Sequence, residues 1–196
     1  MQYDKSLRNI LAANVEQAMG VIEPLLGDVH RAGELIADCF LRDGKLMLCG
    51  SSGAIAISQH LTAMLVNGFE YDRPSLPALA LTATEAAHTD ENNYRELYAR
   101  QVRALGHPGD VVLLFSANTN SAALVQSVIA AHDRQLQVIA ITGAEDQDVS
   151  SILEPEDNEI YVATSSPTRI VEAHLLIAHC FCALIEHKLF GIGESA

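Results

Sequence analysis

The amino-acid sequence predicts an α/β fold, in which a five-stranded parallel sheet is flanked by helices and preceded by an N-terminal helical segment. Short apolar runs closed by turn residues recur along the chain, and helical patterns separate most of them. These runs are continuously apolar rather than alternating, which is typical of strands buried on both faces of a parallel sheet. A chain of 196 residues fits one domain, and we expect a single domain over 1–196.

The N-terminal part of the chain is expected to be helical. Apolar residues recur at helical intervals through most of residues 1–43, before the first strand. The run "KLMLCG" (45–50) then predicts a strand that ends at Gly50, and a helical pattern follows over 54–66. This order predicts a strand, a tight turn and a helix.

Further apolar runs predict the remaining strands at 77–82, 110–116, 137–142 and 159–164. Helical patterns cover 94–105 and 121–135. The acidic stretch 144–159 is expected to be mainly solvated loop, with one helical turn near "VSSIL". A long final helix is predicted to begin at Pro167 and to end at Gly191.

The charge balance argues against direct nucleic-acid binding. The chain has 25 acidic and 12 basic residues, and a formal charge of −13 repels a polyphosphate backbone. No run approaches the roughly 20 apolar residues of a membrane span, and the N-terminus lacks the pattern of a secretory leader. We therefore expect a cytoplasmic protein.

The cysteines and histidines do not predict a metal centre. The 4 cysteines lie mostly in apolar segments without a C-x-x-C pair, and we expect buried free thiols. The 8 histidines are scattered along the chain. Neither a metal nor another cofactor is expected.

Three loops are expected to meet beyond the carboxyl ends of the strands, where such sheets bind ligands. They are "GSSGA" (50–54), "SANTNS" (116–121) and "SSPTR" (165–169). Two of them start helices, whose N–H groups and dipoles suit an anion. Their hydroxyls also suit ordinary helix capping. The candidate ligand-binding residues are Ser51, Ser52, His60, Ser116, Asn120 and Ser121.

Long stretches of the chain, at 49–81, 100–134, 138–143 and 168–190, resemble the sugar isomerase (SIS) domain family. Within the family they resemble the branch that contains sedoheptulose-7-phosphate isomerase and the DnaA initiator-associating protein, and they are most similar to the latter. "RPSLPALAL" and "RALGHPGD" are signatures of this branch. The resemblance implies a flavodoxin-like SIS fold and a homotetramer with sites between subunits. Residues 1–43 would then pack between subunits.

The loops depart from those of the isomerases that they resemble. The first reads "GSSGA" (50–54) instead of Gly-Asn-Gly-Gly-Ser, and the second reads "SANTNS" (116–121) instead of Ser-Thr-Ser-Gly-Asn-Ser. The family residues kept in the second loop are Ser116, Asn120 and Ser121. Ala117 lacks a hydroxyl, and Thr119 places a β-branched side chain where glycine is expected. We expect a recognisable but depleted phosphate site.

The resemblance also implies that a catalytic residue is replaced. Isomerases of this branch have a glutamate base four residues after the histidine equivalent to His60, and here that position is Met64. A thioether cannot accept a proton. The family's histidine on the last helix corresponds to His174, and a glutamine before it to Val171. Some relatives bind zinc through this cluster, and these replacements would remove ligands. His60 and His174 also fit a structural role.

These departures favour a non-catalytic regulator of chromosomal DNA replication initiation that binds the initiator DnaA. The alternatives are a sedoheptulose-7-phosphate (phosphoheptose) isomerase, for which His174 is the residual catalytic candidate, and a phosphosugar-binding sensor. The resemblance implies that Leu189 and Phe190 bind the partner. Phe190 is out of phase with the apolar stripe of the last helix and is expected to face outward, although it also suits packing within the tetramer.

Overall fold

The computed structural model describes residues 2–82, 91–117, 122–144 and 146–191. Its helices are α1 Gln2–Ile22, the 3-10 turn η1 Glu23–Leu25, α2 Leu26–Leu41, α3 Ala54–Asn67, α4 Glu91–Arg95, α5 Ala99–Leu105, α6 Ala122–Asp133, α7 Gln147–Ser150 and α8 Pro167–Phe190. Its strands are β1 Leu46–Gly50, β2 Ala78–Ala80, β3 Val111–Phe115, β4 Gln137–Gly143 and β5 Asn158–Val162.

The strands form one 5-stranded sheet in the order β2-β1-β3-β4-β5, and all neighbouring pairs are parallel. In the register of β1, Leu48 pairs with Ala80 of β2 on one side and with Leu113 of β3 on the other. The strand order reverses direction at β1, so the carboxyl ends of β1 and β3 form the topological switch point. This arrangement confirms the predicted α/β fold.

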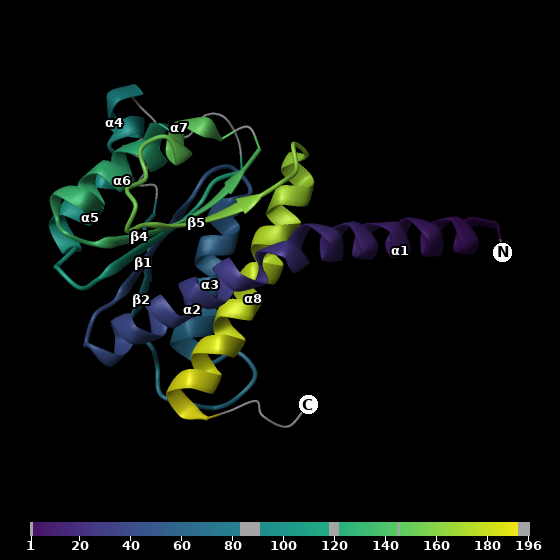
Figure 1. Cartoon of the computed structure of the whole chain (residues 1–196), viewed down its shortest axis with the longest axis horizontal. Coiled ribbons are helices and arrows are strands. Elements are labelled where there is room, and N and C mark those ends of the chain that lie inside the picture. Colours follow the sequence, from purple (N-terminus) through teal and green to yellow (C-terminus); the bar gives the residue numbers. More distant parts are fainter. Residues whose placement is uncertain (1, 83–90, 118–121, 145, 192–196) are drawn as a thin grey trace.

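Helices cover both faces of the sheet (Figure 1). One apolar core lies between the sheet and α2, α3 and α8, and it includes Ile36, Leu61, Phe115 and Phe181. A second core lies on the opposite face, where α5, α6 and α7 pack. Because both faces are covered, the strands β1 and β3 are buried along their whole length.

Helix α1 projects from the body of the protein (Figure 1). The helical pattern predicted for residues 1–43 is present, as α1 and α2 with the turn η1 between them. Large apolar side chains on α1 and at the start of α2 are exposed: Leu7, Ile10, Leu11, Val15, Met19 and Leu26. An amphipathic helix normally covers such a stripe with another surface.

Two details differ from the sequence predictions. The helical turn expected in the acidic stretch 144–159 is present as α7, but Val149 in it is fully buried instead of solvated, because its apolar side chain packs into the second core. Helix α8 is long and apolar enough to cross a membrane, although no such segment was expected. Its most apolar window is 44% buried within the protein, and its packing against α2 and α3 explains that composition as a core helix.

Candidate functional site

The first loop of the site follows β1 without a spacer. A Cβ atom at Gly50 would lie 2.6 Å from the Ala54 carbonyl oxygen, so only glycine lets α3 begin this close to the strand. Ser52 has a φ of +49°, in the left-handed region, and its side chain is exposed. The turn therefore places two serines at the carboxyl end of β1.

Ser51 joins this loop to the end of β3. Its N–H donates to the Phe115 carbonyl oxygen at 3.0 Å, and its hydroxyl accepts the Ala117 N–H at 3.1 Å. Ser116 is fully buried beside it, and its hydroxyl has no hydrogen-bond partner among the residues that the structure describes. The structure thus brings Ser51 and Ser116 together at the switch point. The other two candidates of this loop, Asn120 and Ser121, lie outside the described residues.

Two histidines face each other further along the helices. His60 on α3 and His179 on α8 have their Nε2 atoms 3.4 Å apart, with ring centroids separated by 5.6 Å. Burial, and then the charge of His60, hold the pKa of His179 below its usual range, against the opposing effect of Glu70. A neutral His179 is able to accept a proton near neutral pH.

His174, the residual catalytic candidate on the last helix, does not lie in the histidine pair. It is fully buried with its ring centroid 5.4 Å from that of Phe115. Neither ring nitrogen has a hydrogen-bond partner in the described part of the chain, and burial lowers its pKa to about 3. Residues five apart on a helix point in different directions, so His174 faces the sheet while His179 faces His60.

The positions that the isomerase resemblance assigns to a base and a glutamine hold apolar side chains. Met64 lies one turn beyond His60 on the same side of α3 and is largely buried. The Val171 side chain lies close to Gly53 before the start of α3, 3.4 Å from where a Cβ atom at that position would be. A thioether and an isopropyl group do not suit zinc beside imidazole. Among the described residues, no group of three or more His, Cys, Asp or Glu could hold a metal. The site does not fit zinc.

The far end of the site is closed by a buried ion pair. Arg73 Nε donates to Glu186 Oε1 at 2.9 Å, and both side chains are almost fully buried. Phe190 lies over the guanidinium, with Arg73 Cζ 5.9 Å from its ring centroid, and both Phe190 and Leu189 pack against the core. Phe190 is therefore half-buried and does not face fully outward, because its neighbour Glu186 is itself a buried residue.

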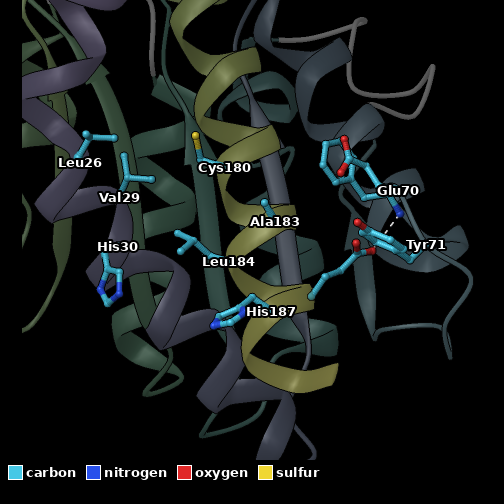
Figure 2. Close-up of a pocket in the computed structure, with 11 residues that line it drawn as sticks. Leu26, Val29, His30, Glu70, Tyr71, Cys180, Ala183, Leu184 and His187 are labelled. Carbon is cyan, nitrogen blue, oxygen red and sulfur yellow. Dashed lines mark hydrogen bonds between the residues drawn. The ribbon is translucent and has the colours of Figure 1, made fainter. Parts of the chain in front are cut away.

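An apolar cavity of about 500 Å³ lies beside this ion pair, between α2, α8 and the segment after α3 (Figure 2). Leu26 and Val29 reach it from α2, and Cys180 and Leu184 from α8. Among the residues that line it, Glu186 belongs to the ion pair and Phe69 also contacts His179. The cavity thus shares a wall with the histidine site.

Sequence reasoning missed His179 because it did not establish how α8 aligns with α3. Three pairs of neighbouring residues show that α3 and α8 run side by side in the same direction. In order along the two helices and the segment after α3, these are Gly53 with Val171, His60 with His179, and Phe69 with Glu186. From the contact of Gly53 with Val171, the spacing alone leads to His60 and His179. The useful signal was a helical offset between two distant segments.

Comparisons with known proteins were consistent with one another. A family model described as SIS domain matches residues 2–143. A phosphoheptose isomerase of Chromohalobacter salexigens is 39% identical over 197 residues, which cover 99% of this chain and 100% of that protein. The solved structure of a phosphoheptose isomerase from Neisseria gonorrhoeae has a TM-score of 0.82 and 30% identity, covering 94% of this chain and 98% of that one. One from Francisella tularensis has a TM-score of 0.84 and 30% identity, covering 95% and 99%.

These comparisons correct the functional hypothesis drawn from the sequence. The relatives are phosphoheptose isomerases, and the matches cover nearly their whole length. This favours the isomerase alternative over a regulator of replication initiation. In the structure Phe190 lies over Arg73 and is only partly exposed, which weakens the geometric argument for DnaA docking. The hypothesis gave too much weight to the replacement at Met64 and too little to the rest of the chain.

Proposed function

Since the chain belongs to the SIS domain family, we propose that it is a sugar-phosphate isomerase of the phosphoheptose type, with sedoheptulose 7-phosphate as a substrate. The observation that carries the proposal is the pairing of His60 with His179 on the two helices that begin beside the serine-lined strand ends. Anion-binding groups and proton-transfer groups then belong to one site.

The spacing of the two parts suits an open-chain sugar phosphate. With a rise of about 1.5 Å per residue, His60 lies roughly 10 Å further along α3 than Gly53. An extended heptose 7-phosphate is about as long from its phosphorus to C1, because a single C–C bond is about 1.5 Å. A phosphate at the exposed turn of Ser52 therefore places the C1–C2 unit beside the histidines.

Aldose–ketose isomerisation moves a proton between C1 and C2 through an enediol, while a second proton moves between the two oxygens. The neutral imidazole of His179 suits removal of the carbon-bound proton, since its pKa lies below the usual range. His60, whose ring is exposed, suits proton exchange with the oxygens. We assign the base to His179 and the oxygen proton transfer to His60.

Met64 favours a second candidate function, which is binding of a phosphosugar without turnover. A thioether occupies the position that the resemblance assigns to the catalytic glutamate. Weak binding at the exposed Ser52 turn needs no base, and the apolar side chain of Met64 does not oppose it. The protein is then a sensor of sugar-phosphate concentration.

One pair of measurements on the purified protein separates the two functions. Turnover of sedoheptulose 7-phosphate, followed by an enzyme-free assay such as NMR, supports the isomerase. A ligand at 100 times its Kd stabilises a protein by about 2.7 kcal/mol, so binding without turnover appears as a raised melting temperature. If the protein shows no turnover and no thermal shift, both candidate functions are contradicted. Glucose, which lacks the phosphate, is the matched control ligand.

We also propose that the protein is a homotetramer, assembled through the helices in residues 1–43. The support is the exposed apolar stripe of α1, with Leu11 64% and Val15 56% exposed. Closed symmetric assemblies commonly bury such stripes. Location in the cytoplasm stays a prediction.

Leu11→Glu is expected to dissociate the tetramer, because a buried unpaired carboxylate in each helix opposes association. Light scattering at micromolar concentration should give a tetramer for the parent and a smaller species for the variant. The matched control is Asn9→Glu, on the side of the same helix opposite Leu11, which should leave the mass unchanged. A monomer mass for the parent protein would refute the proposal.

A further inference from the structure

A buried ion pair ties the ends of both helices that carry the histidines. Arg73 Nη1 donates to the Leu65 carbonyl oxygen at 2.6 Å, and Nη2 donates to that of Met64 at 2.9 Å. These carbonyls belong to the last turn of α3, where helical partners run out. The cationic guanidinium also suits the negative end of the helix dipole. Arg73 therefore fixes the end of the helix that holds His60.

Glu186 fixes the segment that follows α3. Its Oε1 atom accepts the Phe69 N–H at 3.0 Å in addition to the Arg73 Nε–H. Gly68, with a φ of +101°, provides the left-handed turn that brings Phe69 back toward α8. One carboxylate oxygen thus joins α8 to this turn.

Phe69 passes this restraint on to the histidine pair. Its ring centroid lies 5.4 Å from that of His179, with the two ring planes inclined by 34°. His179 and Glu186 lie about two turns apart on α8, and therefore on the same side of the helix. Phe69 is held by the later residue and covers the earlier one.

We propose that Arg73 and Glu186 are positioning residues, which set the orientation of His179 toward His60 by holding Phe69 and the end of α3 in place. The inference rests on the proposed function for its catalytic meaning, but its geometry does not depend on it. Replacing a buried ion pair by apolar side chains often leaves stability unchanged. Stability alone does not require this pair, whereas fixed donors and acceptors give an orientation that apolar side chains cannot.

The test is histidine titration by NMR in a double variant, Arg73→Met with Glu186→Leu. In the parent protein, burial and then the charge of His60 lower the pKa of His179, while Glu70 opposes them. Release of Phe69 should expose the imidazole, so its pKa should rise toward the ordinary value. The matched control is Lys188→Met with Glu34→Leu. It removes a surface ion pair between α8 and α2 and should leave the His179 titration unchanged.

Phe69→Leu provides a second route if the double variant does not fold. It removes the ring from His179 and keeps the ion pair, so the pKa of His179 should rise here too. An unchanged His179 titration in a folded double variant, or in Phe69→Leu, overturns the inference. The titration needs no substrate. Absence of turnover in the parent protein would therefore count against the proposed function, while the titration alone decides this inference.

Discussion

Glu186→Ala is expected to lower the free energy of unfolding by about 3–5 kcal/mol, because it leaves the Arg73 guanidinium buried and without its counter-charge. The side chains of Arg73 and Glu186 are only 1% and 3% exposed, so little water reaches the pair in the folded protein. The Phe69 N–H loses its acceptor in the same variant. Urea unfolding at neutral pH measures the change.

Glu34→Ala is the matched control for this loss. Glu34 on α2 pairs with Lys188, which lies on α8 as Glu186 does. The Glu34 side chain is 45% exposed. Exposed pairs contribute about 0–1 kcal/mol, since water screens both charges. The double variant Arg73→Met with Glu186→Leu should recover most of the stability that Glu186→Ala loses. A loss below about 1 kcal/mol in Glu186→Ala would contradict the buried ion pair.

The strands were predictable because each is a local signal. A strand buried on both faces needs consecutive apolar residues, and runs such as "VVLLF" (111–115) show this without knowledge of their neighbours. The position of the loops followed too, since all strands are parallel and their carboxyl ends share one edge. Ser51 and Ser116 were therefore placed near each other before any contact was known.

The histidine pair was not predictable, because it depends on how two helices are aligned. His60 and His179 are separated by 119 positions in the chain, and the helical pattern of α8 gives its buried side but not its offset along α3. His174 and His179 both fit that pattern as candidates. Only the alignment of α8 with α3, which brings Val171 close to Gly53 and His179 to His60, decides between them.

Phe190 shows that the sequence also did not predict which side of α8 is buried near its end. Its neighbours on α8 include Glu186 and His187, which suggested a polar outward surface. A glutamate is rarely buried unless it is paired, and its partner Arg73 comes from a segment 113 positions earlier. The polarity of a residue therefore gives its burial only when its partners are known.

His179→Ala is expected to lower kcat/KM for sedoheptulose 7-phosphate by about 10²–10⁴-fold, since a positioned proton-transfer group contributes this much. The pH dependence of kcat/KM provides a further test of His179 as the base. As a base, His179 acts only when neutral, and burial with the charge of His60 lowers its pKa. The acid limb of kcat/KM should therefore lie below the ordinary histidine range, and Phe69→Leu should move it to higher pH.

The controls for His179→Ala are two other histidines of the same helix. His187→Ala changes an exposed residue two turns further on and should retain turnover. His174→Ala separates the two assignments, because His174 was the expected catalytic partner but lies buried against Phe115 with a pKa lowered to about 3. An imidazole that cannot be reached by substrate cannot transfer its protons, so His174→Ala should lower the melting temperature more than kcat. If His174→Ala abolishes turnover in a folded protein and His179→Ala does not, the assignment of the base to His179 is wrong.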